Sequence, residues 1–239
     1  MCDVTELDQL PGFRRRFRIT PAAMSVHGAV EDDYHCMAVT IHHDGTTATA
    51  IEPIMARAPW TICPGAIGVL QATFTGVALA DFAARGEKRE NCTHLHDLAV
   101  LAAAHAADRS PLVYDILVSD PIEGRRRAEL RRNGAAVLGW VDAQHIIVEP
   151  AELAGVRVDK LRPWIESLDA PGQEAARLLQ WGAILAHGRS RPLQEQSDAR
   201  SIGADRCYTF QSRRVASAQR IGAIRDFSIG TLQPLERPL

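Results

Sequence analysis

Three separate segments of this chain concentrate residue types that bind metals or transfer protons. Their members are Asp32, Asp33, His35 and Cys36 in the first segment, Cys63 in the second, and Cys92, His94 and His96 in the third. Carboxylates, imidazoles and thiolates are the ligands that Zn²⁺ and Fe²⁺ prefer in proteins. The three segments could therefore supply one metal site, provided that the fold brings them together.

Cys63 and Cys92 each stand where the sequence predicts the start of a helix. A helix N-terminus favours negative charge and lowers the pKa of a cysteine placed there, so either side chain could be a thiolate. The alternative is that each cysteine is a small, buried core residue. The chain has no Cys-x-x-Cys pair, and the sequence leaves both interpretations open.

The histidines differ in their expected roles. His96 follows Cys92 by four residues and shares its helix face, so helical spacing favours His96 over His94 as a partner of Cys92. His42 and His43 lie beside a predicted hairpin turn, where we expect both to face solvent.

The elements that must position these residues are a mixture of strands and helices. Residues 37–54 alternate in polarity around an Asp-Gly pair and predict a β-hairpin. Residues 65–86 are small and apolar at helical spacing, which predicts two short helices broken near Gly76. The following helix extends to about residue 108, with Asn91 or Thr93 as its cap.

Strands and helices are also predicted outside this region. Residues 12–21 resemble a short edge strand, residues 112–120 a strand, and residues 128–150 a hairpin with Asn133-Gly134 near its turn. Two helices are expected over 158–168 and 172–187. The tail is expected to give a strand around 206–211, a short helix and a final extended piece. The fold class is therefore α+β.

Bulk properties exclude some classes of function. The 27 Lys and Arg residues nearly balance the 29 Asp and Glu residues, which gives no electrostatic case for a nucleic-acid partner. The chain starts without the apolar core of a signal peptide, and its apolar runs are too short to cross a bilayer. We expect a cytoplasmic protein with reduced cysteines and no membrane partner, and an oligomer is compatible with the sequence.

The order of motifs resembles a known bacterial family. The segments are "HCMAVTIHHDG", "ICPGAIGVL", "NCTHLHDLAVLAAA", "NGAAVLGW", "EAARLL" and "CYTFQ". They are similar to the family of unknown function DUF2889, and the resemblance covers most of residues 13–230. The family name implies no activity, but its Cys-Thr-His-Leu motif implies that His94 is a ligand or a base.

Residues 33–106 also resemble the U-type iron–sulfur cluster scaffold proteins. In that resemblance the scaffold's first cysteine falls on Asp33, its aspartate on His35, and its other two cysteines on Cys63 and Cys92. The resemblance implies that these four residues converge on one metal ion. Because only two of the positions are thiols, it implies a single Zn²⁺ or Fe²⁺ rather than a cluster.

The resemblance also suggests a division into two lobes. Residues 13–109 would form a scaffold-like hairpin and helix lobe that holds the metal, and residues 110–235 a mixed α+β lobe that serves as a substrate pocket or lid. In the predicted strand near 206–211, Arg206 and Tyr208 could hydrogen bond to an anionic or phenolic substrate. The alternative is that this strand is structural.

The sequence thus predicts a metal-dependent enzyme, a hydrolase or lyase, acting on a small organic substrate that could be aromatic or carry a carboxylate. Zn²⁺ or Fe²⁺ would activate water or polarise a carbonyl, with His94 or Asp33 as acid or base if that residue is not a ligand. One alternative is a non-catalytic protein that carries metal or sulfur, which would need exposed thiolates. Another keeps a zinc ion purely structural.

Overall fold

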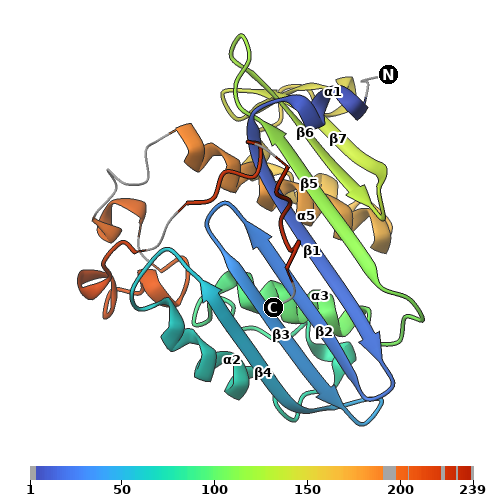
Figure 1. The fold of residues 1–239 in the computed structure, drawn as a ribbon, viewed down its shortest axis with the longest axis vertical. Helices are drawn as coiled ribbons and strands as arrows, with labels where there is room; N and C mark the ends of the chain where they lie inside the picture. Colours follow the sequence, from blue (N-terminus) through green and yellow to red (C-terminus); the bar gives the residue numbers. More distant parts are fainter. Residues whose placement is uncertain (1–3, 191–197, 204, 222–223, 230, 238–239) are drawn as a thin grey trace. The chain divides into compact units, whose positions relative to one another are not determined.

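The computed structural model describes residues 4–190, 198–203, 205–221, 224–229 and 231–237. The chain is an α+β protein with one eight-stranded antiparallel sheet and several helices packed against it (Figure 1). The strand order is β4-β3-β2-β1-β5-β6-β7-β8. The predicted fold class, α+β, is confirmed.

The strands are β1 (Gly12–Ala22), β2 (Ser25–Asp32), β3 (Cys36–His43), β4 (Ala48–Arg57), β5 (Leu112–Ser119), β6 (Arg125–Arg132), β7 (Ala135–Ala143) and β8 (Ile146–Glu149). The α-helices are α1 (Val4–Gln9), α2 (Ala66–Phe74), α3 (Thr93–Ala104), α4 (Arg162–Glu166) and α5 (Ala170–Ala186). Among the described residues, no helix is long and apolar enough to cross a membrane.

The chain divides into two compact units. Unit 1 holds the described residues within Met1–Arg16, Val113–Leu193 and Arg225–Pro234, and unit 2 those within Phe17–Leu112, Gln194–Ile224 and Leu235–Leu239. The candidate metal ligands of all three segments named above lie in unit 2. Its second segment comes from late in the chain, so each unit is assembled from distant parts of the sequence.

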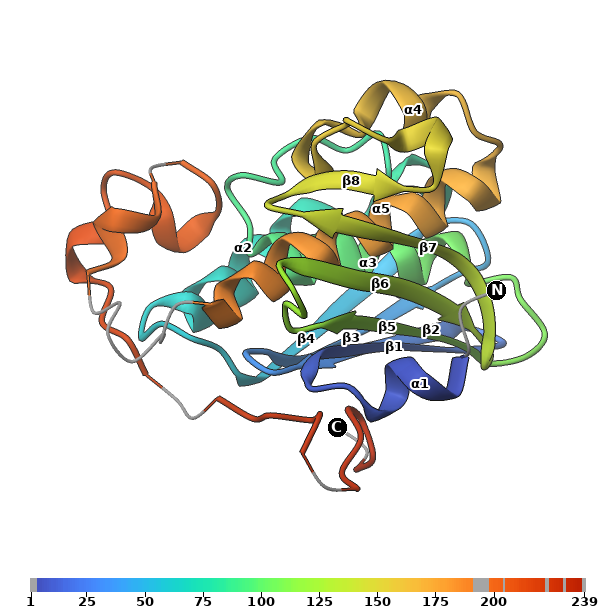
Figure 2. The same ribbon diagram turned by 90° about the horizontal axis from the view of Figure 1, so that it is seen from above.

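In unit 2, helices α2 and α3 cover one face of strands β2 to β4, as Figure 2 shows from above. Helix α3 buries Leu95, Leu98 and Ala102 against β2 and β3. Gly28 on β2 makes this close approach feasible, because a Cβ atom there would lie 3.2 Å from Ala102 Cβ and Leu98 Cδ1. The small apolar residues of α3 therefore set the distance between helix and sheet.

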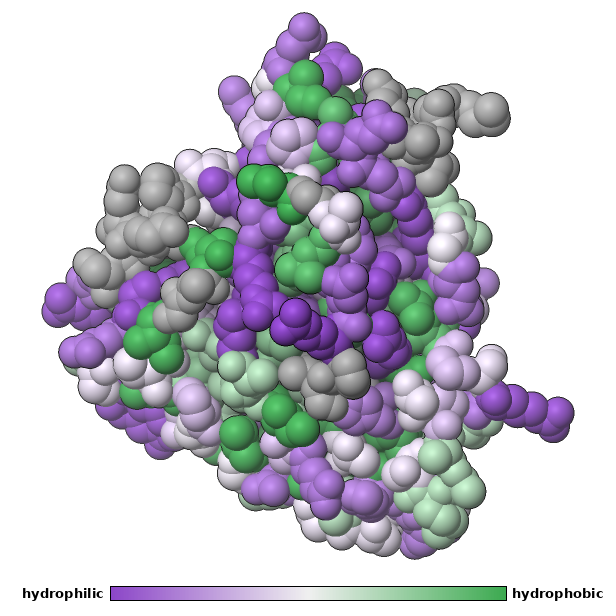
Figure 3. Space-filling view, in the orientation of Figure 1, coloured by the Kyte–Doolittle hydropathy of each residue, from purple (hydrophilic) through white to green (hydrophobic). Residues whose placement is uncertain are grey.

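A residue near the end of the chain covers part of the other face of these strands. Leu235 is buried with Ala29 and Ala38, and its N–H donates to Glu31 Oε2 at 2.8 Å. Its carbonyl accepts from Arg18 Nη2 at 3.0 Å. Elsewhere the face seen in Figure 3 is mostly hydrophilic, with apolar residues in separate patches.

Strand β1 corrects the expectation of a short edge strand, because it lies between β2 and β5 in the sheet. Two of its arginines are buried in unit 1. Arg14 donates to the carbonyls of Leu7 at 3.1 Å and Leu10 at 2.6 Å, and the Arg15 guanidinium lies 5.7 Å from the Trp181 ring. These tertiary partners allow the two arginines to be buried in a central strand, which the sequence of the strand alone could not reveal.

The predicted hairpins and the break near Gly76 are confirmed. Strands β3 and β4 pair in register around the Asp44-Gly45 turn, and β6 and β7 pair around Asn133-Gly134. Helix α2 ends at Phe74, and Gly76 follows with a φ of 80°. Strand β2 was missed, because its sequence mixes charged residues and Gly28 with apolar ones.

The expected cap of α3 is wrong. The N-cap residue is Cys92, whereas the Asn91 side chain donates to Thr73 Oγ1 at 3.0 Å and to the Glu87 carbonyl at 3.1 Å. Asn91 therefore ties the preceding loop to α2 instead of closing the helix end. Local propensity could not reveal this, because Thr73 is distant in sequence.

A buried polar cluster lies between β6, β7 and the end of α5 in unit 1. Arg126 Nη1 contacts His187 Nδ1, and His187 Nε2 lies 3.9 Å from Oδ1 of the buried Asp142. Burial lowers the pKa of His187 to about 3, helped by the charge of Arg126 and by His145. Burial raises the pKa of Asp142, and Arg126 partly offsets that rise.

This cluster predicts a pH-dependent stability. An unfolded His187 binds a proton below a pKa of 6.5, whereas the folded one stays neutral down to about 3, so its contribution is lost as the pH falls through this window. The free energy of unfolding can be measured by urea unfolding for wild type and His187→Gln at several pH values. As the pH falls, the wild-type value should decrease relative to that of the variant by at most about 1.4 kcal/mol per pH unit. A constant difference between pH 7 and pH 4 would contradict this, and His42→Gln serves as the control.

Candidate metal centre

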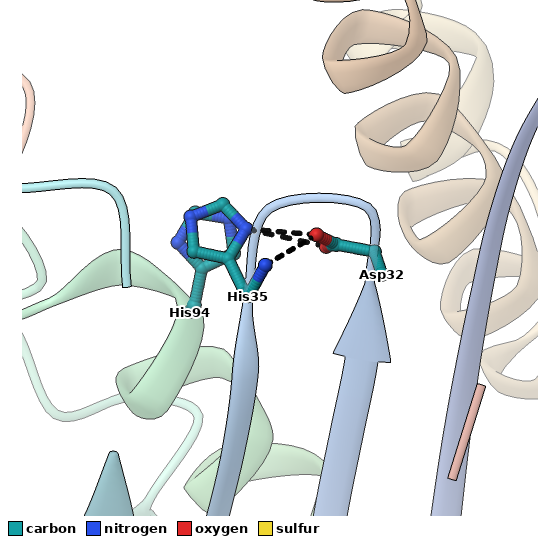
Figure 4. A group of neighbouring side chains, drawn as sticks. All are labelled: Asp32, His35 and His94. Atoms are coloured by element: carbon teal, nitrogen blue, oxygen red, sulfur yellow. Dashed lines mark hydrogen bonds and ion pairs between the residues drawn. The ribbon is translucent and has the colours of Figure 1, made fainter. Parts of the chain in front are cut away.

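Three side chains of unit 2 could hold a metal ion. They are Asp32 at the end of β2, His35 before β3 and His94 in the first turn of α3 (Figure 4). One ligand atom from each lies within 4.8 Å of the other two. Asp32 and His35 are buried, and His94 is partly exposed, which leaves one side of the group open.

The turn between β2 and β3 is organised by the Asp32 carboxylate. Its Oδ1 accepts the N–H groups of Tyr34 and His35, both at 2.8 Å, and the Asp32 N–H donates to the His35 carbonyl at 2.9 Å. An aspartate that accepts from the backbone two and three residues later stabilises a tight turn. This turn therefore fixes the backbone of His35 relative to Asp32.

Arg57 at the end of β4 holds the same turn from outside. Its guanidinium donates to the carbonyls of Asp33 at 2.7 Å, Asp32 at 2.8 Å and His35 at 3.3 Å, and to Glu31 Oε1 at 3.0 Å. Arginine suits this role because its planar group presents five N–H donors in a fixed geometry. The turn is thus fixed by one partly buried cation.

His94 is brought to the turn by α3. Its ring stacks on the ring of His35 with centroids 3.8 Å apart and planes at 27°. His96 lies elsewhere: its Nε2 is 3.3 Å from the Gly86 carbonyl, and its ring packs at 5.1 Å from Phe74. The structure thus places His94 at the site and His96 in the core, opposite to the choice that helical spacing favoured.

The distances within the group fit a metal ion. His35 Nδ1 lies 3.0 Å from Asp32 Oδ1 and 3.3 Å from Oδ2. Two ligands bound at about 2.0 Å to a tetrahedral ion are separated by roughly 3.3 Å. In the absence of a metal the same distance is a hydrogen bond from Nδ1–H to the carboxylate, so a proton and a metal ion would compete for this position.

The other three predicted ligands lie outside this group. Asp33 is buried in the turn next to Asp32, and its carbonyl is bound by Arg57. Cys63 begins a 3₁₀ turn (Cys63–Gly65), and its Sγ lies 3.2 Å from Thr209 Oγ1. Cys92 caps α3. Of the four residues that the resemblance implied, the structure places only His35 in the group.

Of the two interpretations left open for Cys63 and Cys92, burial favours protonated core residues over thiolates. Burial raises the pKa of Cys92 to about 12, and the neighbouring Cys63 and Cys207 add to the rise. The N–H groups of Leu95 and His94 lower the pKa, as expected at a helix N-terminus, but desolvation is the larger effect. Burial likewise raises the pKa of Cys63, against a smaller opposing effect of Thr209.

The predicted strand around 206–211 is also wrong, because Tyr208–Phe210 form a 3₁₀ turn. The Tyr208 N–H donates to the Asn91 carbonyl at 2.9 Å, and the Arg214 guanidinium lies 3.7 Å from its ring centroid. Arg206 is exposed and lies along its own loop near Gly203. Contacts with residues distant in sequence fix this segment, so alternation of residue types could not predict it.

Asp32 is the member of the group that was not selected from the sequence. It was visible as one of two adjacent aspartates, and the family resemblance favoured Asp33. The missed signal is positional: an aspartate that ends a strand three residues before a histidine can accept from that histidine's backbone and ring. Asp32 makes both of these hydrogen bonds.

Comparisons with known proteins add no functional information. No family model matches the sequence, and no curated protein matches it. A solved structure described as "Crystal structure of a Viral Glycoprotein" matches over 80% of this chain and 60% of its own, with 12% identity and a TM-score of 0.21. The chain therefore spans less than two thirds of that protein, and a likeness this weak carries no argument about fold or function.

The role of Arg57 can be tested by substitution. Arg57→Met removes the donors of four acceptors and leaves the buried Glu31 without this cation, which should lower the free energy of unfolding by about 3 kcal/mol or more. The matched control is Arg162→Met, which removes an exposed ion pair with Glu166 and should leave the free energy of unfolding nearly unchanged. Equal effects of the two variants in urea unfolding would refute the role of Arg57.

Proposed function

We propose that this protein is a metal-dependent enzyme of the hydrolase or lyase type, with Asp32, His35 and His94 holding one Zn²⁺ or Fe²⁺. The observation that carries the proposal is the convergence of three ligand atoms within 4.8 Å, from a strand end, a turn and a helix start. A carboxylate and two imidazoles are suitable ligands for either ion.

The number of ligands favours catalysis over a purely structural ion. Structural zinc sites use four protein ligands, whereas catalytic sites use three and leave a position for water or substrate. The partial exposure of His94 provides an open side for such a ligand. A bound metal would activate a water molecule or polarise a carbonyl of the substrate.

The side chains around the group would prepare it for binding. Asp32 is oriented by the N–H groups of Tyr34 and His35, and Arg57 holds the three carbonyls of the turn. Metal binding requires the ionised form of the Asp32 carboxylate and a neutral imidazole at His35 and His94. His94 would turn out of its stack on His35 so that both lone pairs point to the ion.

Tyr208 is the residue that we propose to orient the substrate. Its N–H bonds to the Asn91 carbonyl, next to the first turn of α3 that presents His94. Its segment belongs to the same compact unit as the metal group, which supports a role beside the site for this part of the chain. Arg206, exposed on the same loop, would attract a small organic substrate that carries a carboxylate.

The alternative, a carrier of metal or sulfur, needs thiolates that a partner can reach. Cys63 and Cys92 are buried, and burial raises the pKa of both thiols. These two observations favour the enzyme over the carrier.

Metal titration tests the proposal directly. Purified protein, stripped with a chelator, should bind one equivalent of Co²⁺ or Zn²⁺, and Co²⁺ should give the visible absorption of a low-symmetry site. Asp32→Asn, His35→Ala and His94→Ala should each weaken binding by at least tenfold to a hundredfold. The control is His42→Ala, a half-exposed histidine paired with Glu52.

Two outcomes would overturn the proposal. One is wild-type protein that binds no metal while remaining folded. The other is loss of metal in Cys63→Ser and Cys92→Ser with retention in Asp32→Asn and His94→Ala, which would move the site to the thiols.

A further inference from the structure

A second site of different chemistry lies in unit 2, at the other end of β3 from the metal group. An open pocket of about 690 Å³ is lined there by the β3–β4 turn, the segment around Leu79–Asp81 and the last turns of α3. Its walls are mostly alanine methyl groups together with Leu79, Phe82 and Val100. A volume of this size and an apolar lining are typical of small-molecule sites.

His43 is the ionisable residue in this lining, and it corrects an expectation from the sequence. Both His42 and His43 were expected to face solvent, but His43 is 6% exposed. Successive residues of a strand point to opposite faces, so only His42 faces outward, where it pairs with Glu52. His43 points to the side covered by helices.

The hydrogen bonds of His43 define which nitrogen carries its proton. The Gly45 N–H donates to Nδ1 at 3.1 Å, so Nδ1 is an acceptor and Nε2 carries the hydrogen of the neutral ring. Nε2 is buried and has no hydrogen-bond partner within the part of the chain that the structure describes. A buried donor without an acceptor is unfavourable, and native proteins seldom leave one unsatisfied.

We propose that this cavity binds an uncharged aliphatic molecule whose hydroxyl or carbonyl oxygen accepts a hydrogen bond from His43 Nε2. The apolar walls would cover the hydrocarbon chain. Nε2 is buried behind the lining, so the His43 ring would rotate on binding to reach the ligand oxygen.

The charges around the cavity favour a neutral ligand over a fatty acid. Among the residues that the structure describes, no lysine or arginine belongs to the lining. Asp44 lies at the rim, between His43 and the lining residues Gly45 and Thr46, and its Oδ1 accepts from the N–H groups of Thr46 at 2.9 Å and Thr47 at 2.8 Å. These hydrogen bonds keep Asp44 ionised, so it would repel a carboxylate.

This site is separate from the metal group. His35 precedes and His43 ends the eight-residue strand β3, which places the two histidines roughly 26 Å apart along the strand at about 3.3 Å per residue. In Figure 1 the β2–β3 and β3–β4 turns lie at opposite ends of these strands. The inference does not depend on the proposed enzymatic function.

Displacement of the neutral fluorescent probe N-phenyl-1-naphthylamine from the full-length protein tests the inference. Alkan-1-ols from hexan-1-ol to decan-1-ol should bind about threefold to fourfold more tightly per added methylene until the cavity is full. Octanoate should bind more weakly than octan-1-ol. His35→Ala, which alters only the metal group, should bind the alcohols as wild type does.

Two kinds of variant separate the roles of the cavity and of His43. His43→Asn keeps an acceptor for the Gly45 N–H but removes the Nε2 donor. It should therefore weaken the binding of octan-1-ol about fivefold to tenfold and leave the binding of oct-1-ene unchanged. Ala104→Phe and Ala83→Trp narrow the cavity from exposed positions and should abolish binding of both. Ala72→Trp, an exposed alanine outside the lining, is the control.

Any of three results would overturn the inference. The first is an affinity that does not rise along the alcohol series in wild-type protein. The second is a folded His43→Asn variant that binds octan-1-ol as tightly as wild type, and the third is octanoate that binds wild-type protein as tightly as octan-1-ol.

Discussion

The candidate metal centre depends on the hydrogen bonds that the Arg57 guanidinium donates. The guanidinium joins the end of β4 to three carbonyls of the β2–β3 turn and to the buried Glu31. Glu31 in turn accepts the N–H of Leu235, from near the end of the chain. One partly buried cation therefore connects two strands, a turn and a distant segment, and its directional hydrogen bonds hold the backbone that carries Asp32 and His35.

Strand β3 is the element that the two candidate sites share. His35 directly precedes the strand and His43 is its last residue, and both histidines are buried. At the first end the imidazole has a carboxylate and a second imidazole beside it, which suits a metal ion. At the second end the imidazole faces methyl groups, which suits a hydrocarbon ligand with one polar atom.

The cysteines illustrate how burial can reverse a local electrostatic effect. Cys92 has the helix N-terminus that would favour a thiolate, and two N–H groups of the first turn do lower its pKa. Removal of the side chain from water opposes ionisation more strongly, so the sulfur stays protonated. Burial also keeps His187 neutral in unit 1, but there no effect opposes it, because the Arg126 charge lowers the pKa in the same direction.

The sequence by itself determined the α+β class, the hairpins around Asp44-Gly45 and Asn133-Gly134, and the break at Gly76, because these depend on contacts between close neighbours. It also identified the segments around residues 32–36 and 92–96. Only the tertiary structure decided that Asp32 rather than Asp33 joins His35, and that His94 rather than His96 joins them. Those choices depend on the rotation of α3 about its axis and on the bonds of one turn, which residues distant in sequence, such as Gly28 and Arg57, impose.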